Sequence, residues 1–430
     1  MPPTLNTLNS LALNVSLAFA AVLIAGVLLK LWLASRQIRH VARHRASVPP
    51  VFASQVDLAA HQKAADYTIA RMRVSIVDVL LAAVITLGWT LLGGLDALNQ
   101  TLLAMLGGGM AQQLALLAAF MVINGLLEMP LSLYQTFVLE QRFGFNRTTV
   151  GVWLSDLLKS SLIGALIGLP LAALILWLMG AAGPAWWFWT WVVWVAFNLL
   201  LLLIYPTFIA PLFNRFEPLQ DETVRERVTR LMERCGFRAS GLFVMDGSRR
   251  SAHANAYFTG FGASRRVVFF DTLLNQLSPG EIEAVLAHEL GHFRRRHVIQ
   301  RMAALFLASL LGLALLGWLS NQAWFFVGLG VLPNLGAGLG APNDALALLL
   351  FLLAVPVFST FITPVWSQLS RRHEFEADAF AAEHASGREL ATALLRLYRD
   401  NASTLTPDPV FARFYYSHPP AAERLARLPA

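Results

Sequence analysis

The stretch Ser278–His292, with the sequence SPGEIEAVLAHELGH, predicts a helix that brings two histidines to one place. Ser278 suits the N-cap, Pro279 suits the first helical position, and Glu281 completes a capping box. His288 and His292 are four residues apart, so their rings lie on one face of the helix, one turn apart. The stretch therefore predicts a well-framed helix with paired imidazole nitrogens.

His288, Glu289 and His292 form the pattern H-E-x-x-H, which is typical of catalytic zinc sites. One Zn²⁺ can take a nitrogen from each ring, and the glutamate then lies where it can accept a proton from a zinc-bound water. A hydrogen-bonded pair of core histidines is the structural alternative, but it does not explain the glutamate between them. We predict one Zn²⁺ per chain, with Glu289 as the general base.

A catalytic zinc site needs a third protein ligand and one open position. In the metzincin pattern a third histidine follows the second by six residues, but Val298 stands at that position here. His297 is displaced by one residue, and we expect it to face elsewhere on the helix. The third ligand must therefore come from another segment.

An acidic segment farther along the chain can supply that ligand. The segment Ser370–Asp378, SRRHEFEAD, carries Glu374 and Asp378 four residues apart, so both point the same way on a helix. One of them can bind zinc while the other holds a ligand histidine in place. By spacing alone Glu376 and His373 stay open as ligands, and a solvated, charged helix end is the structural alternative.

The rest of the chain is strongly apolar. Of its 430 residues, 56% are hydrophobic and 14% are charged, and the mean hydropathy is +0.56. Soluble proteins carry roughly 25% charged residues, so we predict a multi-pass integral membrane protein. An apolar run of about 20 residues crosses the hydrocarbon core of a bilayer. The runs of this kind lie at 11–34, 76–94, 111–139, 154–178, 185–212, 298–322 and 344–368.

The distribution of basic residues predicts the orientation of these seven spans. The polar stretch 35–75 carries Arg36, Arg39, Arg43, Arg45, Lys63, Arg71 and Arg73. The connections at 95–110, 179–184 and 323–343 contain no Lys or Arg. Positive-inside reasoning places the N-terminus outside and the polar segments 213–297 and 369–430 in the cytosol. The net charge of +7 then follows from topology, and we expect no nucleic-acid partner.

A small β-structure is predicted just before the histidine helix. The run Arg266–Phe270, RVVFF, is typical of a strand, and Asn255-Ala256-Tyr257 suits the paired strand of a hairpin. An exposed edge strand can add a peptide substrate as one more strand, so Asn255 is a candidate for substrate binding, with a turn residue as the alternative. Cys235 is the only cysteine, so no internal disulfide can form, and we expect a packed, inert thiol.

Five ordered motifs resemble those of the integral-membrane zinc metalloproteases of the C-a-a-X prenyl protease type. The resemblance covers nearly the whole chain and includes the expected topology. The motifs are Phe143-Gly144-Phe145-Asn146, Ser251-Ala252-His253-Ala254-Asn255-Ala256-Tyr257, His288–His292, Ser370–Asp378 and Tyr416-Ser417-His418-Pro419. Such proteases are gluzincins. The resemblance implies a mainly α membrane protein, a bundle of seven transmembrane helices enclosing a chamber, and a cytosolic gluzincin-type metalloprotease domain with a small β-hairpin.

The resemblance also implies roles for individual residues. It makes Glu374 the third zinc ligand beside the two histidines. It makes Asp378 a residue that holds a zinc ligand in place without binding the metal itself. It places Asn255 on the substrate-binding edge and His418 in the active site, where we take it as the donor to the developing oxyanion. Without the resemblance, the residues Pro419-Pro420 would favour a helix-start contact for His418.

The implied activity is zinc-dependent hydrolysis of peptide bonds, with C-terminal processing of farnesylated or geranylgeranylated C-a-a-X proteins. A membrane-protein quality-control protease without prenylated substrates is the first alternative. A transporter is another, with Glu128 and Asp156 as charges along a path, although each can equally be a helix-end or interhelical partner. An inactive scaffold is the last, and the intact motifs argue against it.

We expect four parts along the chain. Residues 1–212 hold five spans and the basic cytosolic loop 35–75, and 213–297 form a cytosolic protease segment with the H-E-x-x-H helix. Residues 298–368 hold the last two spans, and 369–430 form a cytosolic C-terminal segment with the third ligand. The partners are a peptide or protein substrate and the lipid bilayer, in a bacterial inner membrane or, for a eukaryotic protein, in the endoplasmic reticulum.

Overall fold

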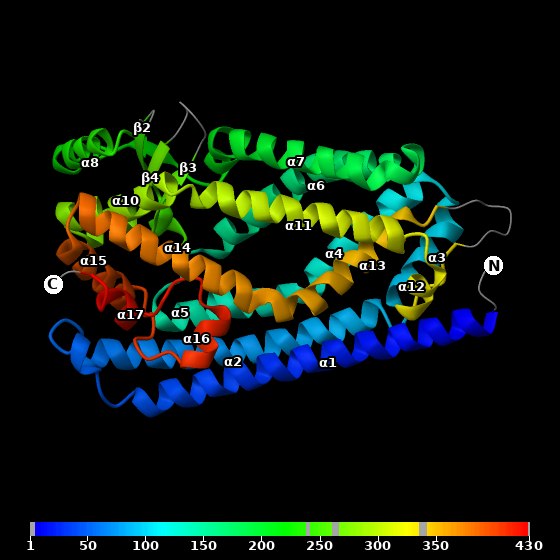
Figure 1. Cartoon of the computed structure of the whole chain (residues 1–430), viewed down its shortest axis with the longest axis horizontal. Helices are drawn as coiled ribbons and strands as arrows, with labels where there is room; N and C mark the ends of the chain where they lie inside the picture. The colour runs from blue at the N-terminus through cyan, green and yellow to red at the C-terminus, as the bar shows by residue number, and fades with distance from the viewer. Residues whose placement is uncertain (1–4, 238–240, 260–265, 335–341, 429–430) are drawn as a thin grey trace.

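The computed structural model describes residues 5–237, 241–259, 266–334 and 342–428. Long helices lie along the longest axis of the molecule, and a small sheet with its covering helices stands at one end (Figure 1). The helices of the long bundle, with the short turns that join or extend them, are α1 Leu5–His44, η1 Pro50–Phe52, α2 Leu58–Trp89, α3 Gly94–Leu106, α4 Met110–Tyr134, η2 Gln135–Glu140, α5 Gln141–Phe143, α6 Val150–Ala181, η3 Gly183–Ala185, α7 Trp186–Ile204, η4 Tyr205–Ile209, η5 Ala210–Leu212, α11 His297–Leu319, α12 Ala323–Gly328, α13 Asp344–Ser359 and η8 Thr360–Ile362.

The remaining elements build the domain at the end of the bundle. They come from two parts of the chain, one between α7 and α11 and one after α13. They are β1 Phe216–Pro218, α8 Glu222–Arg234, β2 Gly241–Met245, η6 Gly247–Arg249, β3 Ala256–Thr259, β4 Arg266–Phe270, α9 Asp271–Gln276, α10 Pro279–Arg294, α14 Thr363–His384, α15 Gly387–Asp400, α16 Pro409–Tyr415 and α17 Ala421–Leu425.

Within the described residues, seven helical stretches are long and apolar enough to cross a membrane, which confirms the predicted number. Several join more than one element: α4 continues through η2 into α5, and α13 continues through η8 into α14. The stretches are Asn9–His44, Leu58–Trp89, Met110–Phe143, Val150–Ala181, Gly183–Leu212, His297–Leu319 and Asp344–His384.

The prediction that 35–75 is a loop is wrong for most of its length. Helix α1 continues to His44 and α2 already begins at Leu58, where the Asp57 side chain caps it by accepting a hydrogen bond from the Ala60 amide. Hydropathy marks only the apolar part of a helix. Beyond that part α1 stays helical because Gln37 and Val41, both fully buried, pack inside the protein.

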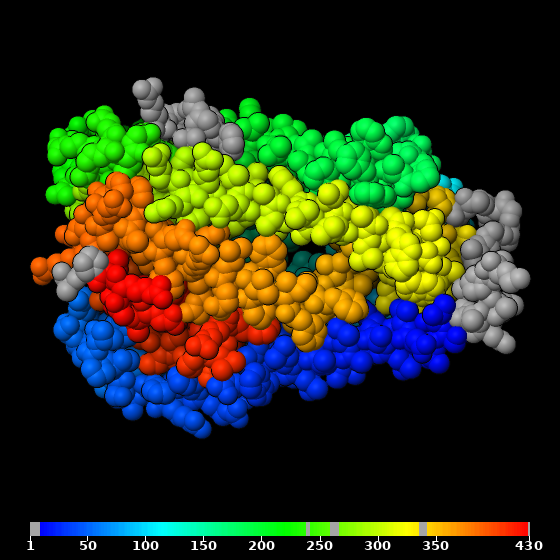
Figure 2. Space-filling model, viewed as in Figure 1, coloured from blue at the N-terminus to red at the C-terminus, as the bar shows by residue number. Residues whose placement is uncertain are grey.

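The buried residues of the spans and of the end domain gather in two separate apolar cores. One apolar core gathers at the end of the bundle near α3 and α12, and a second lies around the sheet, α10 and α14 at the other end. Between them the spans bury little: at most 39% of the residues in any span's most apolar window are buried. Figure 2 shows the surface hollowed between α11 and α13, with far-wall helices visible behind.

The predicted hairpin is present and belongs to a larger sheet. Strands β3 and β4 pair antiparallel, with Ala256 opposite Phe269, and β4 also pairs in parallel with β2. The strand order is β1-β2-β4-β3, so β3 is an edge strand. Sequence reasoning missed β1, which has only three residues, and β2, whose apolar run Gly241–Met245 has the same length as β4.

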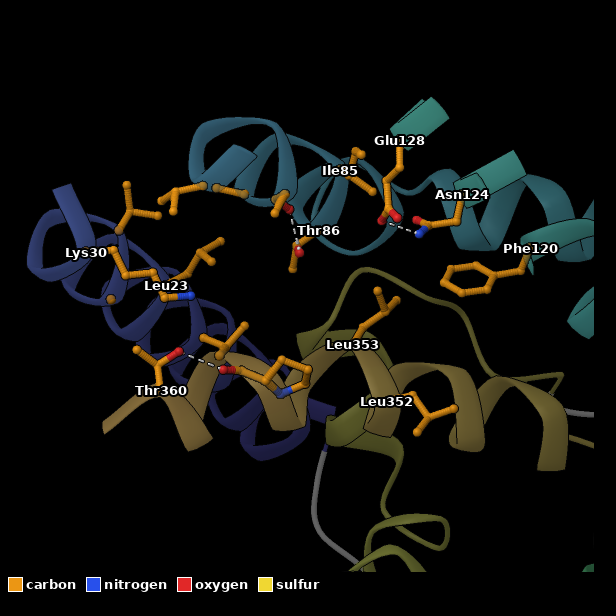
Figure 3. Close-up of a pocket in the computed structure, with 17 residues that line it drawn as sticks. Leu23, Lys30, Ile85, Thr86, Phe120, Asn124, Glu128, Leu352, Leu353 and Thr360 are labelled. Atoms are coloured by element: carbon orange, nitrogen blue, oxygen red, sulfur yellow. Dashed lines mark hydrogen bonds between the residues drawn. The ribbon is translucent and has the colours of Figure 1, made fainter. Parts of the chain in front are cut away.

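The two ionisable residues considered for transport both have protein partners. Asp156 on α6 forms a two-pronged ion pair with Arg250, whose Nε and Nη2 lie 2.7 and 2.9 Å from its two oxygens. Glu128 accepts a hydrogen bond of 2.7 Å from Asn124 and lines a cavity of about 370 Å³ between α1, α2, α4 and α13, together with Lys30 (Figure 3). Asp156 thus ties α6 to the sheet domain and is not a free charge.

Candidate active site

The histidine helix α10 begins with the predicted capping box. The Ser278 hydroxyl accepts a bond from the Glu281 amide, and the Glu281 carboxylate accepts one from the Ser278 amide at 2.7 Å. Glu281 is buried and also pairs with Arg396 on α15 at 2.8 Å. The start of α10 is therefore fixed both to its own backbone and to a neighbouring helix.

Gly291 allows α10 to lie directly against α14. A Cβ at this position would be 2.9 Å from the Ala377 Cα and 3.0 Å from the Phe380 Cβ, closer than ordinary contact. A glycine is therefore needed at this position of the H-E-x-x-H motif so that the two helices can pack closely. Without a side chain there, the histidines of α10 come within reach of the acidic residues of α14.

His288, His292 and Glu374 converge, as predicted. The Nε2 atoms of the two histidines are 3.2 Å apart. Glu374 places Oε2 3.5 Å from His288 Nε2 and Oε1 3.3 Å from His292 Nε2. One ligand atom from each residue lies within 4.8 Å of the others, so the group could hold one metal ion.

Two observations show that this group fits a zinc ion. Donors at zinc–nitrogen distances of about 2.0–2.1 Å in a tetrahedron are roughly 3.3 Å apart, close to the separations found here. Glu374 Oε2 is buried and has no hydrogen-bond partner among the described residues, which would be costly if nothing ever bound it. A cation bound between the three side chains would give that oxygen a partner and would accept both histidine Nε2 atoms as ligands.

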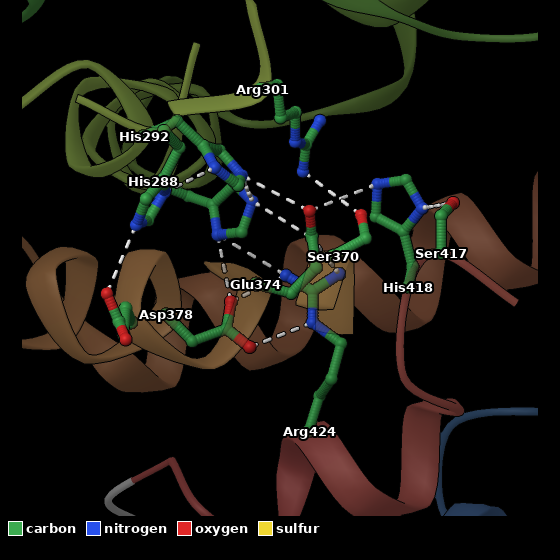
Figure 4. Close-up of polar contacts among 11 residues, drawn as sticks. His288, His292, Arg301, Ser370, Glu374, Asp378, Ser417, His418 and Arg424 are labelled. Atoms are coloured by element: carbon green, nitrogen blue, oxygen red, sulfur yellow. Dashed lines mark hydrogen bonds and ion pairs between the residues drawn. The ribbon is translucent and has the colours of Figure 1, made fainter. Parts of the chain in front are cut away.

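Behind His288 lies a buried chain of charges (Figure 4). His288 Nδ1 is 2.9 Å from Asp378 Oδ1, and Arg424 binds both Asp378 oxygens at 2.8 and 2.5 Å. Burial acts to lower the pKa of His288, but hydrogen bonds to Asp378 and Glu374 more than offset it and raise the pKa to about 9. The site therefore favours positive charge at the point where the ring nitrogens meet.

His297 contacts His292, so the expectation that it faces elsewhere is wrong. Arg296 adopts a left-handed conformation, with φ of 59°, and breaks the helix between α10 and α11. The His297 ring then turns back, with Nδ1 3.0 Å from His292 Nδ1 and Nε2 3.1 Å from Glu376 Oε2. His373 stacks on His297 with ring centroids 4.0 Å apart. Glu376 and His373, left open as ligands, thus contact His297, which in turn contacts His292, and they lie outside the ligand group found among the described residues.

His418 and Glu289 flank the metal-binding group. His418 Nε2 is 3.5 Å from Glu374 Oε1, its Nδ1 is 3.0 Å from the Ser417 hydroxyl, and 62% of its side chain is exposed. Glu289 is half-buried and makes no hydrogen bond to a described residue, which leaves its carboxylate free for a substrate or water. Asn255 is exposed and stands one residue before β3, where its carbonyl accepts a bond from the Phe270 amide.

Arg424 and His297 were missed by sequence reasoning. Arg424 follows His418 by six residues in a short helix, a spacing that carries no known signal. Its charge is buried only because Asp378 lies opposite, which no local pattern could show. His297 needed the helix break at Arg296, a conformation that is rare outside glycine.

The fold and this site define a class of protein: a membrane-embedded metallopeptidase whose metal-binding group stands at one end of a hollow helical bundle. Residues 37–215 match the sequence profile of the CAAX prenyl protease N-terminal region with five membrane helices, and residues 218–430 match peptidase family M48.

Solved and curated proteins agree with these profiles. The chain is 36% identical to CAAX prenyl protease 1 of Saccharomyces cerevisiae over 74% of its own length and 72% of the yeast protein. It is 29% identical to CAAX prenyl protease 1 homolog of Homo sapiens over 95% of both chains. The crystal structure of S. mikatae Ste24p superposes with a TM-score of 0.91 at 30% identity, covering 97% of this chain and 99% of that one. The chain belongs to the CAAX prenyl protease 1 family of M48 peptidases, and it is a multi-pass membrane metalloendopeptidase.

Proposed function

We propose that this chain hydrolyses peptide bonds with one zinc ion held by His288, His292 and Glu374. The convergence of these three side chains is the observation that carries the proposal. When bound, zinc lowers the pKa of a water and polarises a carbonyl group. Asp378 and His297 keep the two histidine rings oriented through their Nδ1 atoms.

Two further side chains carry the proton and charge changes of the reaction. Glu289, which is free of other partners in the described structure, accepts the proton of the attacking water and passes it to the leaving amine. His418 stands on the open side of Glu374 and donates to the substrate oxygen as that oxygen becomes negative.

We propose C-terminal C-a-a-X segments of prenylated proteins as substrates. The names of the yeast and human relatives refer to this activity. The edge of β3 that pairs with no other described strand, with Asn255 just before its start, can bind an extended peptide as an added strand. The hollow between the two cores gives the apolar prenyl group and the hydrolytic water a shared compartment, beside a membrane that holds the substrate's lipid.

The decisive experiment combines metal analysis with cleavage of a fluorogenic farnesylated C-a-a-X peptide by the purified protein. Glu289→Ala should retain about one zinc per chain and lose cleavage, and His288→Ala should lose both. Glu283→Ala is the matched control, because this glutamate of α10 pairs with Arg227 and Arg234 and lies outside the ligand group. Zinc with cleavage only of unfolded membrane proteins would move the function to quality control, and absence of zinc would refute the mechanism.

We also propose that the sheet domain faces the cytosol and that the α3–α4 turn faces the opposite side. The C-terminal end of α1, whose sequence includes Arg39 and Arg43, lies at the sheet end of the bundle (Figure 1). In a Cys235→Ser background, an impermeant maleimide should label Glu226→Cys only from the cytosolic side and Met105→Cys only from the other. Both positions are exposed. Reversed labelling would refute this orientation.

A further inference from the structure

Two cavities lie along α2, and the first of them adjoins the catalytic group through His418. One, of about 570 Å³, is lined by His418 and Arg71, and the other, of about 580 Å³, is lined by Arg71, Ser251 and His253. Tyr67 and Asn401 line both, so the two cavities are neighbours along α2. The first has the volume of a sphere about 10 Å across, and three extended residues span about 10 Å.

Among the arginines that line these cavities in the described structure, Arg71 is the one that forms no ion pair. Three arginines line them among the described residues, and two of these form ion pairs: Arg250 with Asp156 and Arg424 with Asp378. Arg71 is exposed and forms no ion pair with a described carboxylate; its guanidinium lies 5.4 Å from the centre of the Tyr67 ring. The carboxylate of Glu140, which lines the second cavity, accepts a hydrogen bond from the Tyr67 hydroxyl. Such a cation is available to an anionic ligand.

The side chains around Arg71 bond to and pack against one another. The Tyr67 hydroxyl donates to Glu140 at 2.6 Å, and the Tyr67 ring packs against Phe143 and Phe145. Phe145 in turn stacks on His253, with ring centroids 4.4 Å apart. The first two motifs of the sequence, which the zinc chemistry does not use, thus build the wall that holds Arg71 in place.

Antiparallel addition of a peptide to the edge strand β3 would point the substrate's C-terminus toward this wall. A peptide added antiparallel to β3 runs opposite to it, so the residues after the cut lie beside the start of β3 and the segment before it. That segment contains Ser251 and His253, which line the cavity shared with Arg71. The released part of the peptide therefore leads from His418 toward the unpaired guanidinium.

We propose that Arg71 binds the free α-carboxylate at the C-terminus of the substrate and so positions the cut a short distance from the chain end. The inference rests on the proposed peptidase function and names the subsite that selects a C-terminal segment. It makes Arg71 a specificity-determining residue that does not take part in bond cleavage. The shared chemistry is that of a bidentate Arg–carboxylate pair.

The test compares two farnesylated peptides of identical sequence, one with a free C-terminal carboxylate and one with a C-terminal amide. The wild-type protein should cleave the acid with a kcat/KM about 10- to 100-fold above that of the amide, the range for one charge-assisted pair, mainly through KM. Arg71→Gln should cleave the two at equal rates, and Arg71→Lys should restore part of the preference. Arg73→Gln, an exposed cation two residues along α2 that lines neither cavity, should behave as wild type.

Zinc content and thermal unfolding of each variant establish that it is folded. Peptide affinity measured in a Glu289→Ala background gives a second readout, in which Arg71→Gln should weaken binding of the acid to the level of the amide. Equal cleavage of acid and amide by the wild type, or a preference that survives Arg71→Gln, would overturn the inference while leaving the peptidase in place. Zinc-loaded wild type that cleaves neither peptide would instead overturn the proposed function on which the inference rests.

Discussion

Gly291→Ala tests whether the close approach of α10 and α14 creates the metal site. The new Cβ would meet the Ala377 Cα at 2.9 Å, against an ordinary carbon–carbon contact of about 3.5–4.0 Å. Because that neighbour is backbone, no rotamer change can relieve the contact, and α14 must move by about 0.6–1.1 Å. Glu374 would move with it, away from both histidines.

The expected effects on stability and on metal binding differ in size. Overpacking costs about 1–3 kcal/mol, and replacing a mid-helix glycine by alanine returns about 1 kcal/mol, so unfolding should become easier by at most about 2 kcal/mol. Metal–ligand distances tolerate only about 0.2 Å, so a shift of this size should weaken zinc binding severely and lower kcat/KM about 100-fold.

The assay measures zinc affinity by chelator competition, peptide cleavage and thermal unfolding in the same preparations. Gly280→Ala, on the same helix, is the matched control: its new Cβ would meet only the end of the flexible Glu389 side chain at 3.0 Å. Gly280→Ala should keep zinc and activity. If Gly291→Ala binds zinc and cleaves peptide as the wild type does, helix approach does not limit the site and the reasoning fails.

Three further results are expected. His297→Gln should weaken zinc binding about 10- to 100-fold with little change in thermal stability, since the His297 ring supports His292 from behind; unchanged chelator competition would contradict this. Asp378→Ala should lower the unfolding temperature, because it leaves the buried Arg424 charge without its partner at a cost of about 3–5 kcal/mol. An unchanged melting curve would contradict this expectation. Arg250→Lys should loosen the sheet domain from α6, since a lysine cannot reproduce the two-pronged bond to Asp156; limited proteolysis no faster than in wild type would count against the tether.

The membrane class and the number of spans could be predicted because hydrophobicity is a property of local composition. Helix ends were harder: α1 extends past the apolar run to His44, where buried contacts with the C-terminal segment continue it. The hairpin followed from the apolar run of β4, but the three-residue β1 did not, because so short a strand is defined by its partner; β2 has an apolar run as long as that of β4 and was overlooked. Their pairing joins residues near 216, 243 and 268, which only the folded chain brings together.

The sequence by itself determined that His288 and His292 share one face, since helical spacing is a local property, and that Glu374 and Asp378 share another. It also determined the membrane class, because repeated apolar runs long enough to cross a bilayer are typical of membrane-spanning helices. Only the tertiary structure decided which acid meets which histidine, and that Arg424 and His297 complete the site. Those contacts depend on how α10, α11, α14 and α17 pack, and packing is set by many distant side chains at once.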